Sequence, residues 1–178
     1  MPGIVRLVGL LLVAMYCLGS SSSNADSARV IEVREGDLLV VMSEGRMQKV
    51  RLYGVICPVR GQPHHERARA LSSYLSIHRN VELTSVYRDG EGVANALVRL
   101  EGTKYYLNER LVGYGMAWVK PKECRAALCE QWRGLQELAR KNAIGLWATM
   151  AVPPWEWAKE QRMEIHRRQE GGAAGEKQ

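Results

Sequence analysis

The chain has 178 residues, with 25 Lys and Arg against 19 Asp and Glu, four Cys and no Phe. Apolar residues make up 46% and charged residues 25%, a composition that excludes a largely disordered, fibrous or cysteine-dense protein. The length suits one domain, and no apolar stretch reaches the ~18 residues that would indicate a membrane span.

The first residues have the pattern of a secretory signal peptide. A short basic start with Arg6 precedes an apolar run at residues 7–19, and a polar stretch then ends at Ala25. Because Ser23 and Ala25 are small, we expect cleavage after Ala25; a retained amphiphilic anchor is the less favoured alternative. Loss of Arg6 lowers the formal net charge from +6 to +5. We therefore expect an exported protein, periplasmic or secreted.

Export would place the remaining cysteines in an oxidising compartment. Cys124 and Cys129 lie five positions apart around a predicted short turn, and we expect them to form a disulfide. In the loop-entropy model, closing so short a loop stabilises the fold by about 2 kcal/mol. This pairing leaves Cys57 without a cysteine partner. Cys57 precedes Pro58 and is interpreted as a small buried apolar residue rather than a reactive thiol.

Alternating apolar and polar residues predict five strands. The expected strands are residues 28–33, 38–42, 47–55, 81–87 and 93–100. The turns Glu35-Gly36-Asp37 and Ser43-Glu44-Gly45 separate the first three strands. Such closely spaced turns between β-branched runs indicate an antiparallel meander.

Helical spacing predicts three helices. They are expected at about residues 64–79, from Asn108 to Gly113 or Gly115, and along the apolar stripe that begins at Leu128 and Trp132. Residues 150–157 are expected to form an extended strap, and residues 158–178 a polar tail consisting of a frayed helix and a disordered end. The order of elements predicts an α+β fold at residues 28–157, a five-stranded OB-type β-barrel capped by three helices.

Seven short segments occur in the order seen in a known family. They are Val33-Arg34-Glu35-Gly36-Asp37, Val50-Arg51-Leu52-Tyr53-Gly54-Val55, Pro58, Leu107-Asn108-Glu109, residues 111–119, Ile144-Gly145-Leu146-Trp147 and Pro153-Pro154-Trp155-Glu156-Trp157. Together they resemble the thermonuclease (staphylococcal nuclease-like) family, and the last segment resembles the end of exported bacterial members. The match covers roughly residues 28–157, and the fold it implies is the same OB barrel with three helices.

The resemblance implies a phosphodiesterase that cuts DNA and RNA with one calcium ion. In this family, acids of two segments hold the calcium, a Glu is proposed as the base that takes a proton from water, and two Arg contact the phosphate. Carried over by position, Glu35 and Asp37 match the two acids of the first turn. Arg51 matches the first phosphate-binding Arg.

The other chemical positions of the family are replaced. The metal-holding Asp falls on Ile56, its neighbouring Thr on Cys57, the Glu base on Val59, the second Arg on Val93, and the Tyr residues near the nucleotide on Val119 and Lys120. A general base contributes about 10²–10⁴-fold to a rate, and an Arg clamp ~10³–10⁵-fold in other phosphoryl-transfer enzymes. The pattern therefore predicts that hydrolysis is lost and that no cofactor is bound, with calcium as the alternative.

The remaining polar residues also have simpler interpretations. Asp37 is often only a turn residue in such a position, and Arg51 could form an ion pair with Glu35 or Asp37; both interpretations come ahead of catalysis. The run His64-His65-Glu66 is interpreted as a solvated helix start, because adjacent His side chains do not converge on one metal ion.

The positive charge suggests nucleic acid as a partner, since Lys and Arg neutralise phosphates. The candidate contacts are Lys104, Tyr105, Lys120 and Lys122, against the simpler interpretation that basic residues cover solvated faces. Three hypotheses follow. The favoured one is a thermonuclease-like pseudoenzyme that binds nucleic acid or an envelope protein; the others are an active calcium-dependent nuclease with a rearranged site and a purely structural envelope domain.

Overall fold

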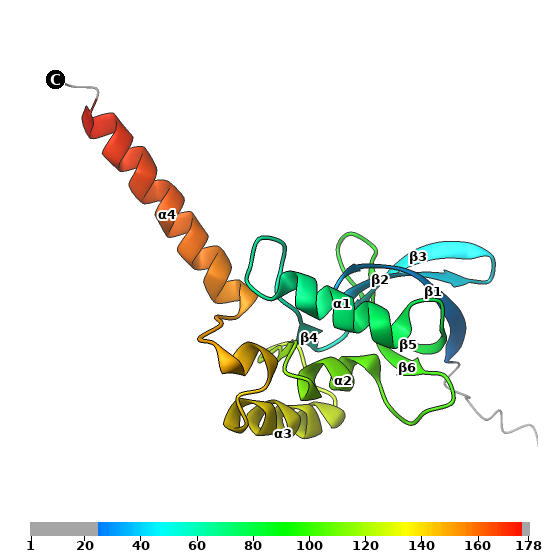
Figure 1. The fold of residues 1–178 in the computed structure, drawn as a ribbon. Helices are drawn as coiled ribbons and strands as arrows, with labels where there is room; N and C mark the ends of the chain where they lie inside the picture. Colours follow the sequence, from blue (N-terminus) through cyan, green and yellow to red (C-terminus); the bar gives the residue numbers. More distant parts are fainter. Residues whose placement is uncertain (1–24, 176–178) are drawn as a thin grey trace, which may run out of the picture.

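The computed structural model describes residues 25–175, and Figure 1 shows their arrangement. The expected signal peptide falls, apart from Ala25, outside the described residues. The fold that follows consists of a β-barrel, three helices packed against it and a fourth helix that extends away from it (Figure 1).

Five strands close into a barrel in the order β1-β2-β3-β6-β5. They are β1 (Asp26–Glu35), β2 (Leu38–Ser43), β3 (Arg46–Leu52), β5 (Asn80–Arg88) and β6 (Ala94–Leu100). The pair β3 and β6 is parallel, and the other neighbours are antiparallel. The α+β class and the five-stranded barrel predicted from the sequence are confirmed.

The barrel interior is filled by the apolar half of each alternating strand. Val30, Val41, Val50, Val81 and Val98 are all fully buried. Because successive side chains of a strand point to opposite faces, β-branched residues at every second position fill the inside, and the polar residues between them face water. This burial is the main source of stability for the domain.

The third predicted strand is divided in the structure. The expectation of one strand at residues 47–55 was wrong, because β3 ends at Leu52 and Gly54 adopts a φ of 73°. This left-handed conformation suits glycine and turns the chain into the short strand β4 (Val55–Ile56). Strand β4 pairs with β7 (Trp118–Val119) outside the barrel.

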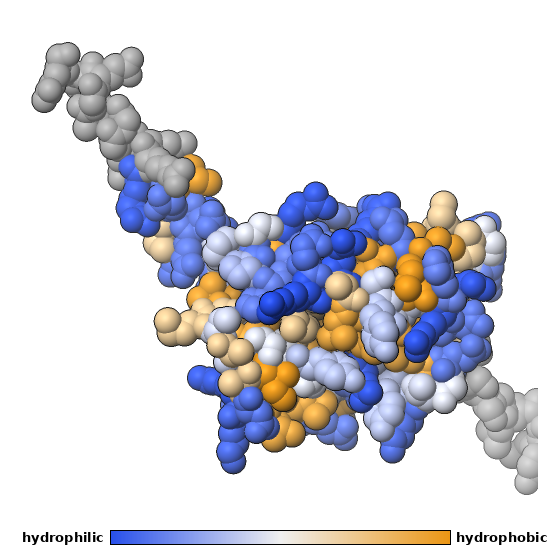
Figure 2. Space-filling model, viewed as in Figure 1, coloured by the Kyte–Doolittle hydropathy of each residue, from blue (hydrophilic) through white to orange (hydrophobic). Residues whose placement is uncertain are grey.

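Three helices cover the barrel. They are α1 (His65–Ser76), α2 (Leu107–Gly113) and α3 (Leu128–Lys141). Helix α1 contacts β1, and α2 lies between β6 and the other two helices. Trp132 of α3 is fully buried, as its predicted apolar stripe requires. On the face seen in Figure 2, hydrophilic residues dominate along α1, with apolar areas exposed between charged side chains.

The C-terminal segment differs from the extended strap predicted for residues 150–157. After the 3-10 helix η1 (Gly145–Ala148), helix α4 begins at Pro154 and continues to Gly175, across the expected boundary at residue 158. The prediction of an extended strap was wrong for its second half. Proline, with its fixed φ and missing N–H, suits the first turn of a helix. Helix α4 points away from the barrel (Figure 1). Within residues 25–175, no helix combines the length and apolarity needed to cross a bilayer.

Candidate functional site

The turn between β1 and β2 is pressed against its neighbours. A Cβ atom on Gly36 would lie 2.7 Å from Sγ of Cys57 and 3.1 Å from Cβ of Ala68. Only glycine allows this approach, which brings the turn against the loop after β4 and against α1. As a result, the side chain of Asp37 is only 3% exposed, whereas Glu35 remains half-buried.

Arg51 lies next to Asp37 because of the register of the barrel. Leu38 faces Arg51 across β2 and β3, and the backbone N–H of Leu52 donates to the carbonyl oxygen of Asp37 at 2.9 Å. Nη1 of Arg51 lies 3.6 Å from Oδ2 of Asp37. The ion pair expected for Arg51 therefore forms with Asp37, and the Arg51 side chain remains 31% exposed.

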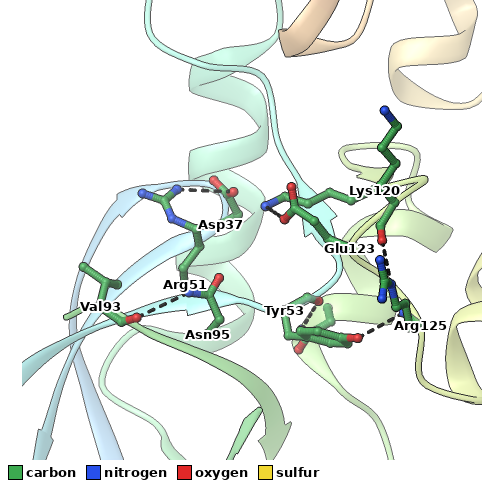
Figure 3. A network of polar contacts seen from close by, with 10 residues as sticks. Asp37, Arg51, Tyr53, Val93, Asn95, Lys120, Glu123 and Arg125 are labelled. Atoms are coloured by element: carbon green, nitrogen blue, oxygen red, sulfur yellow. Dashed lines mark hydrogen bonds and ion pairs between the residues drawn. The ribbon is translucent and has the colours of Figure 1, made fainter. Parts of the chain in front are cut away.

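A second cation reaches the same carboxylate from another element. Lys120 directly follows β7, and its N–H donates to the carbonyl of Gly54 at 2.8 Å. Its side chain is only 14% exposed, and its Nζ lies 2.7 Å from Oε2 of Glu123. Figure 3 shows the Lys120 ammonium directed toward Asp37 from the side opposite to Arg51.

Burial controls the ionisation of Asp37. The pKa of Asp37 is raised from 3.8 to about 6, chiefly by loss of water contact and also by the negative charge of Glu35. The positive charges of Arg51 and Lys120 act in the opposite direction and favour the carboxylate. The charged form of Asp37 in this site therefore depends on cations supplied by the protein itself.

The replaced family positions hold apolar side chains that differ in burial. Ile56 and Val59 are half-buried, and Val93 is buried. Val93 sits at the end of the β5–β6 loop, where Oδ1 of Asp89 accepts a hydrogen bond from its N–H at 2.9 Å. Burial raises the pKa of Cys57, so this thiol is neutral and unreactive, as its interpretation as a core residue requires.

These residues do not fit a calcium ion. Calcium takes six to eight oxygen ligands, several of them carboxylates. Here the site offers Asp37 and Glu35, and nowhere in residues 25–175 do three His, Cys, Asp or Glu side chains gather as metal ligands would. Oδ2 of Asp37 is buried without a hydrogen bond, but the charge that faces it is the Arg51 guanidinium.

A groove of about 390 Å³ opens beside Lys120. It is lined by Ile56, Lys120, Pro121, Lys122, Glu123 and Trp155. Trp155 comes from the first turn of α4 and is 42% exposed. The sequence predicted Lys120 and Lys122 as contacts, whereas Trp155 was assigned only to the closing segment.

The disulfide holds the Lys120 segment in place. Cys124 and Cys129 are bonded, as predicted. The bond lies so close to the turn before β4 that a Cβ on Gly54 would come within 2.5 Å of Sγ of Cys124. Nearby, the hydroxyl of Tyr53 accepts a hydrogen bond from the N–H of Arg125 at 3.0 Å. These contacts, drawn in part in Figure 3, fix the backbone that carries Lys120.

A larger cleft, of about 790 Å³, lies between β1 and α1. Its lining includes Glu66, whose Oε2 accepts hydrogen bonds from Nε and Nη2 of Arg69 at 3.0 and 2.9 Å. These bonds lower the pKa of Glu66, which makes it a weaker base. Nδ1 of His65 also contacts Glu66, at 3.1 Å, while His64 contacts Thr149 instead, so the two histidines do not converge.

The other two predicted contacts, Lys104 and Tyr105, lie elsewhere. Tyr105 lines a pocket of about 290 Å³ with Arg110 and Tyr114. The Arg110 guanidinium lies 4.7 Å from the centre of the Tyr105 ring and 5.4 Å from that of Tyr114, and Nζ of Lys104 lies 5.6 Å from the Tyr105 ring. The four residues proposed to bind nucleic acid therefore belong to two separate surfaces.

Comparison with known proteins agrees with the fold and the motifs. The model of the family described as staphylococcal nuclease homologue matches residues 49–149. The chain is 27% identical to an uncharacterized endonuclease of Haemophilus influenzae over 163 residues, covering 90% of this chain and 88% of the relative. It is 31% identical to Protein ParB of Escherichia coli over 150 residues, with 80% and 82% covered. It is 29% identical to a micrococcal nuclease of Shigella flexneri over 143 residues, with 73% and 79% covered.

The barrel with its capping helices, the matched motifs and the extent of these similarities lead to one assignment: the chain belongs to the staphylococcal nuclease homologue family.

Proposed function

We propose that this protein is an exported nucleic-acid-binding domain that has lost calcium-dependent phosphodiester hydrolysis. The observation that carries the proposal is the environment of Asp37. Its buried carboxylate forms an ion pair with Arg51, 3.6 Å away, and the charge of Lys120 also acts on it, while the corresponding family positions hold Ile56 and Val59.

Hydrolysis requires a base that takes a proton from the attacking water. The isopropyl group of Val59 accepts no proton, and the nearby cleft offers no better group because Glu66 is hydrogen-bonded to Arg69. Glu32, in the same cleft, is paired with Arg34 at 3.2 Å. The lowered pKa of Glu66 opposes general-base catalysis by this group near neutral pH.

Nucleic-acid binding draws on different features. Two of the similar proteins carry the names of nucleases, and nucleic acid is the substrate of such enzymes. In this chain the groove beside the site is lined by Lys120 and Lys122 together with the exposed Trp155. Ammonium groups attract phosphates, and an exposed aromatic ring stacks on bases of a single strand.

The proposed loss of hydrolysis is tested on the purified protein with a fluorogenic single-stranded DNA and a matching RNA. Each substrate is incubated with calcium, with magnesium and with a chelator. We expect no cleavage above the level of Asp37→Ala, which serves as the matched control. Calcium-dependent cleavage that disappears in Asp37→Ala would overturn the proposal and favour an active nuclease.

Binding is tested by fluorescence anisotropy of a labelled single-stranded oligonucleotide. Neutralisation of phosphates by Lys and Arg makes the affinity fall as salt rises from ~50 to ~200 mM. We expect measurable binding in chelator and a clear decrease over this range. No binding at the lower salt concentration, or an affinity that does not depend on salt, would instead support a structural envelope domain.

A further inference from the structure

Besides Arg51, a second cation that acts on the buried carboxylate belongs to an element remote in sequence. Lys120 follows β7, whereas Asp37 lies in the turn between β1 and β2. The Lys120 side chain is 14% exposed, so its long stem runs through the protein rather than into water. In Figure 3 its ammonium lies between Asp37 and Glu123, with the two carboxylates on either side of one positive charge.

A metal site in a protein is also a point where carboxylates from different elements share one cation. In this chain Asp37 and Glu123 supply the carboxylates, and Lys120 supplies the charge. Ile56 lines the same groove as Lys120 and adds a hydrocarbon wall where an oxygen ligand would be needed. A divalent ion would therefore meet both an ammonium charge and an apolar surface.

We infer that Lys120 is the resident cation of this site, in place of a calcium ion. The Lys120 ammonium then supplies the positive charge that binds a phosphate, and the domain needs no metal ion for this purpose. The inference deepens the proposed function and rests on it in one respect: the ligand of the Lys120 ammonium is a phosphate of a single-stranded nucleic acid, bound directly.

The backbone contacts explain why Lys120 holds this position. Its N–H is fixed to the carbonyl of Gly54, and the disulfide from Cys124 to Cys129 closes the chain soon after it. The ion pair with Glu123 at 2.7 Å orients the ammonium further. An ammonium held in place loses less conformational entropy when it meets a ligand, which favours binding.

The first test measures calcium binding without nucleic acid, through the melting temperature of the protein. Ile56→Asp adds a carboxylate to the groove that Lys120 lines but keeps Lys120, whereas Ile56→Asp/Lys120→Ser also removes the ammonium. A ligand that binds the folded state raises the melting temperature. We expect no calcium-induced shift for wild type or Ile56→Asp, and an upward shift for the double variant.

Two outcomes would overturn the inference. If Ile56→Asp alone responds to calcium as strongly as the double variant, Lys120 does not stand in the place of the metal. If the double variant also ignores calcium, removal of the ammonium exposes no cation site. A calcium-induced shift in the wild-type protein would contradict it as well.

The second test measures oligonucleotide affinity by anisotropy in chelator and in calcium. We expect equal affinities for wild type in the two buffers and a loss of about tenfold in Lys120→Met, the size expected for one charge-assisted hydrogen bond. The matched control is Lys141→Met, an exposed lysine at the end of α3, which should change the affinity much less. Equal losses in the two variants would overturn the role of Lys120 in phosphate binding.

The two tests separate the inference from the proposed function. If wild type binds no oligonucleotide in either buffer, the proposed function fails, and the melting experiment still decides whether Lys120 replaces the metal. If wild type binds only with calcium, the inference fails while nucleic-acid binding stands.

Discussion

Asn108 and Asp37 are both buried polar side chains, yet the structure satisfies one completely and the other poorly. Oδ1 of Asn108 accepts from the N–H of Val98 at 3.0 Å, and its Nδ2 donates to the carbonyls of Tyr53 and Ala96 at 3.0 and 3.2 Å. Oδ2 of Asp37 has no hydrogen bond and only an ion pair at 3.6 Å.

The difference shows what each region does for the fold. Asn108 joins α2 to β6 and to the end of β3, so it holds the scaffold together through groups that are all paired. Asp37 is an acid kept in a site that disfavours its charge, and it adds no comparable bonds to the fold. A residue that costs stability in this way is typical of a functional position rather than a structural one.

The largest effect is expected from Asn108→Ala, which removes the side-chain partner of the Val98 N–H and of the Tyr53 carbonyl, while the Ala96 carbonyl still accepts from the N–H of Tyr53 at 2.9 Å. Because each such group costs about 1–3 kcal/mol, we expect a loss of about 4 kcal/mol in the free energy of unfolding, measured by urea denaturation. The matched control is Asn95→Ala, because buried Asn95 makes a single local bond to the carbonyl of Val93 at 3.3 Å. Equal losses in both variants would break the contrast drawn for Asn108.

Asp37→Asn is expected to stabilise the protein near neutral pH. The pKa of Asp37 is raised in the folded state to about 6, so the unfolded chain releases this proton first as the pH rises above about 4. Stability is therefore fully present at low pH and falls through the window up to about pH 6. A shift of about two pKa units corresponds to about 3 kcal/mol.

This prediction is measured as the difference in unfolding free energy between wild type and Asp37→Asn at a series of pH values. The variants should be nearly equal below pH 4, with Asp37→Asn more stable above pH 6. A difference of the opposite sign, with wild type gaining stability as the pH rises, would mean that Arg51 and Lys120 outweigh the burial of Asp37.

Loss of the disulfide should have a smaller effect on stability. The double variant Cys124→Ala/Cys129→Ala is expected to lose about 2 kcal/mol, because the bond closes a short loop. Urea denaturation of wild type with and without a reductant gives an independent value. A much larger loss would show that the bond packs against Gly54 as part of the core and does more than restrict the unfolded chain.

The smallest effect is expected on binding rather than on stability. Trp155→Ala removes an exposed ring from the groove and should weaken binding of a single-stranded oligonucleotide by about 1 kcal/mol, the lower end of the range for one stacked base. Anisotropy measures the change, and Tyr74→Ala, an exposed aromatic on α1, is the matched control. Equal affinities for wild type and Trp155→Ala would remove the groove from the proposed binding surface.

Much of the scaffold follows from local pattern. Alternation in β1 and β2, and the pair Cys124 and Cys129, were enough to predict strands and a disulfide, because both depend on residues close in sequence. The division at Gly54 was missed because Val55 continues the apolar pattern while the backbone turns. The start of helix α4 was not predicted, because the sequence Pro153-Pro154 is equally compatible with an extended segment.

The site was harder to predict because it is assembled from distant segments. The motif comparison identified Glu35, Asp37 and Arg51, and the register of β2 and β3 explains the contact between Asp37 and Arg51. Nothing local in the sequence brings Lys120 toward Asp37, since that approach depends on the pairing of β4 with β7. Trp155 lines the groove from the first turn of α4, and its only signal in the sequence was a Trp in the closing segment.

Isothermal titration of calcium into the purified wild-type protein examines the replaced metal position most directly. We predict no saturable heat of binding for wild type or for Asp37→Asn, because Lys120 and Ile56 leave no place for the ion. Stoichiometric binding to wild type that Asp37→Asn abolishes would contradict this and restore Asp37 as a calcium ligand.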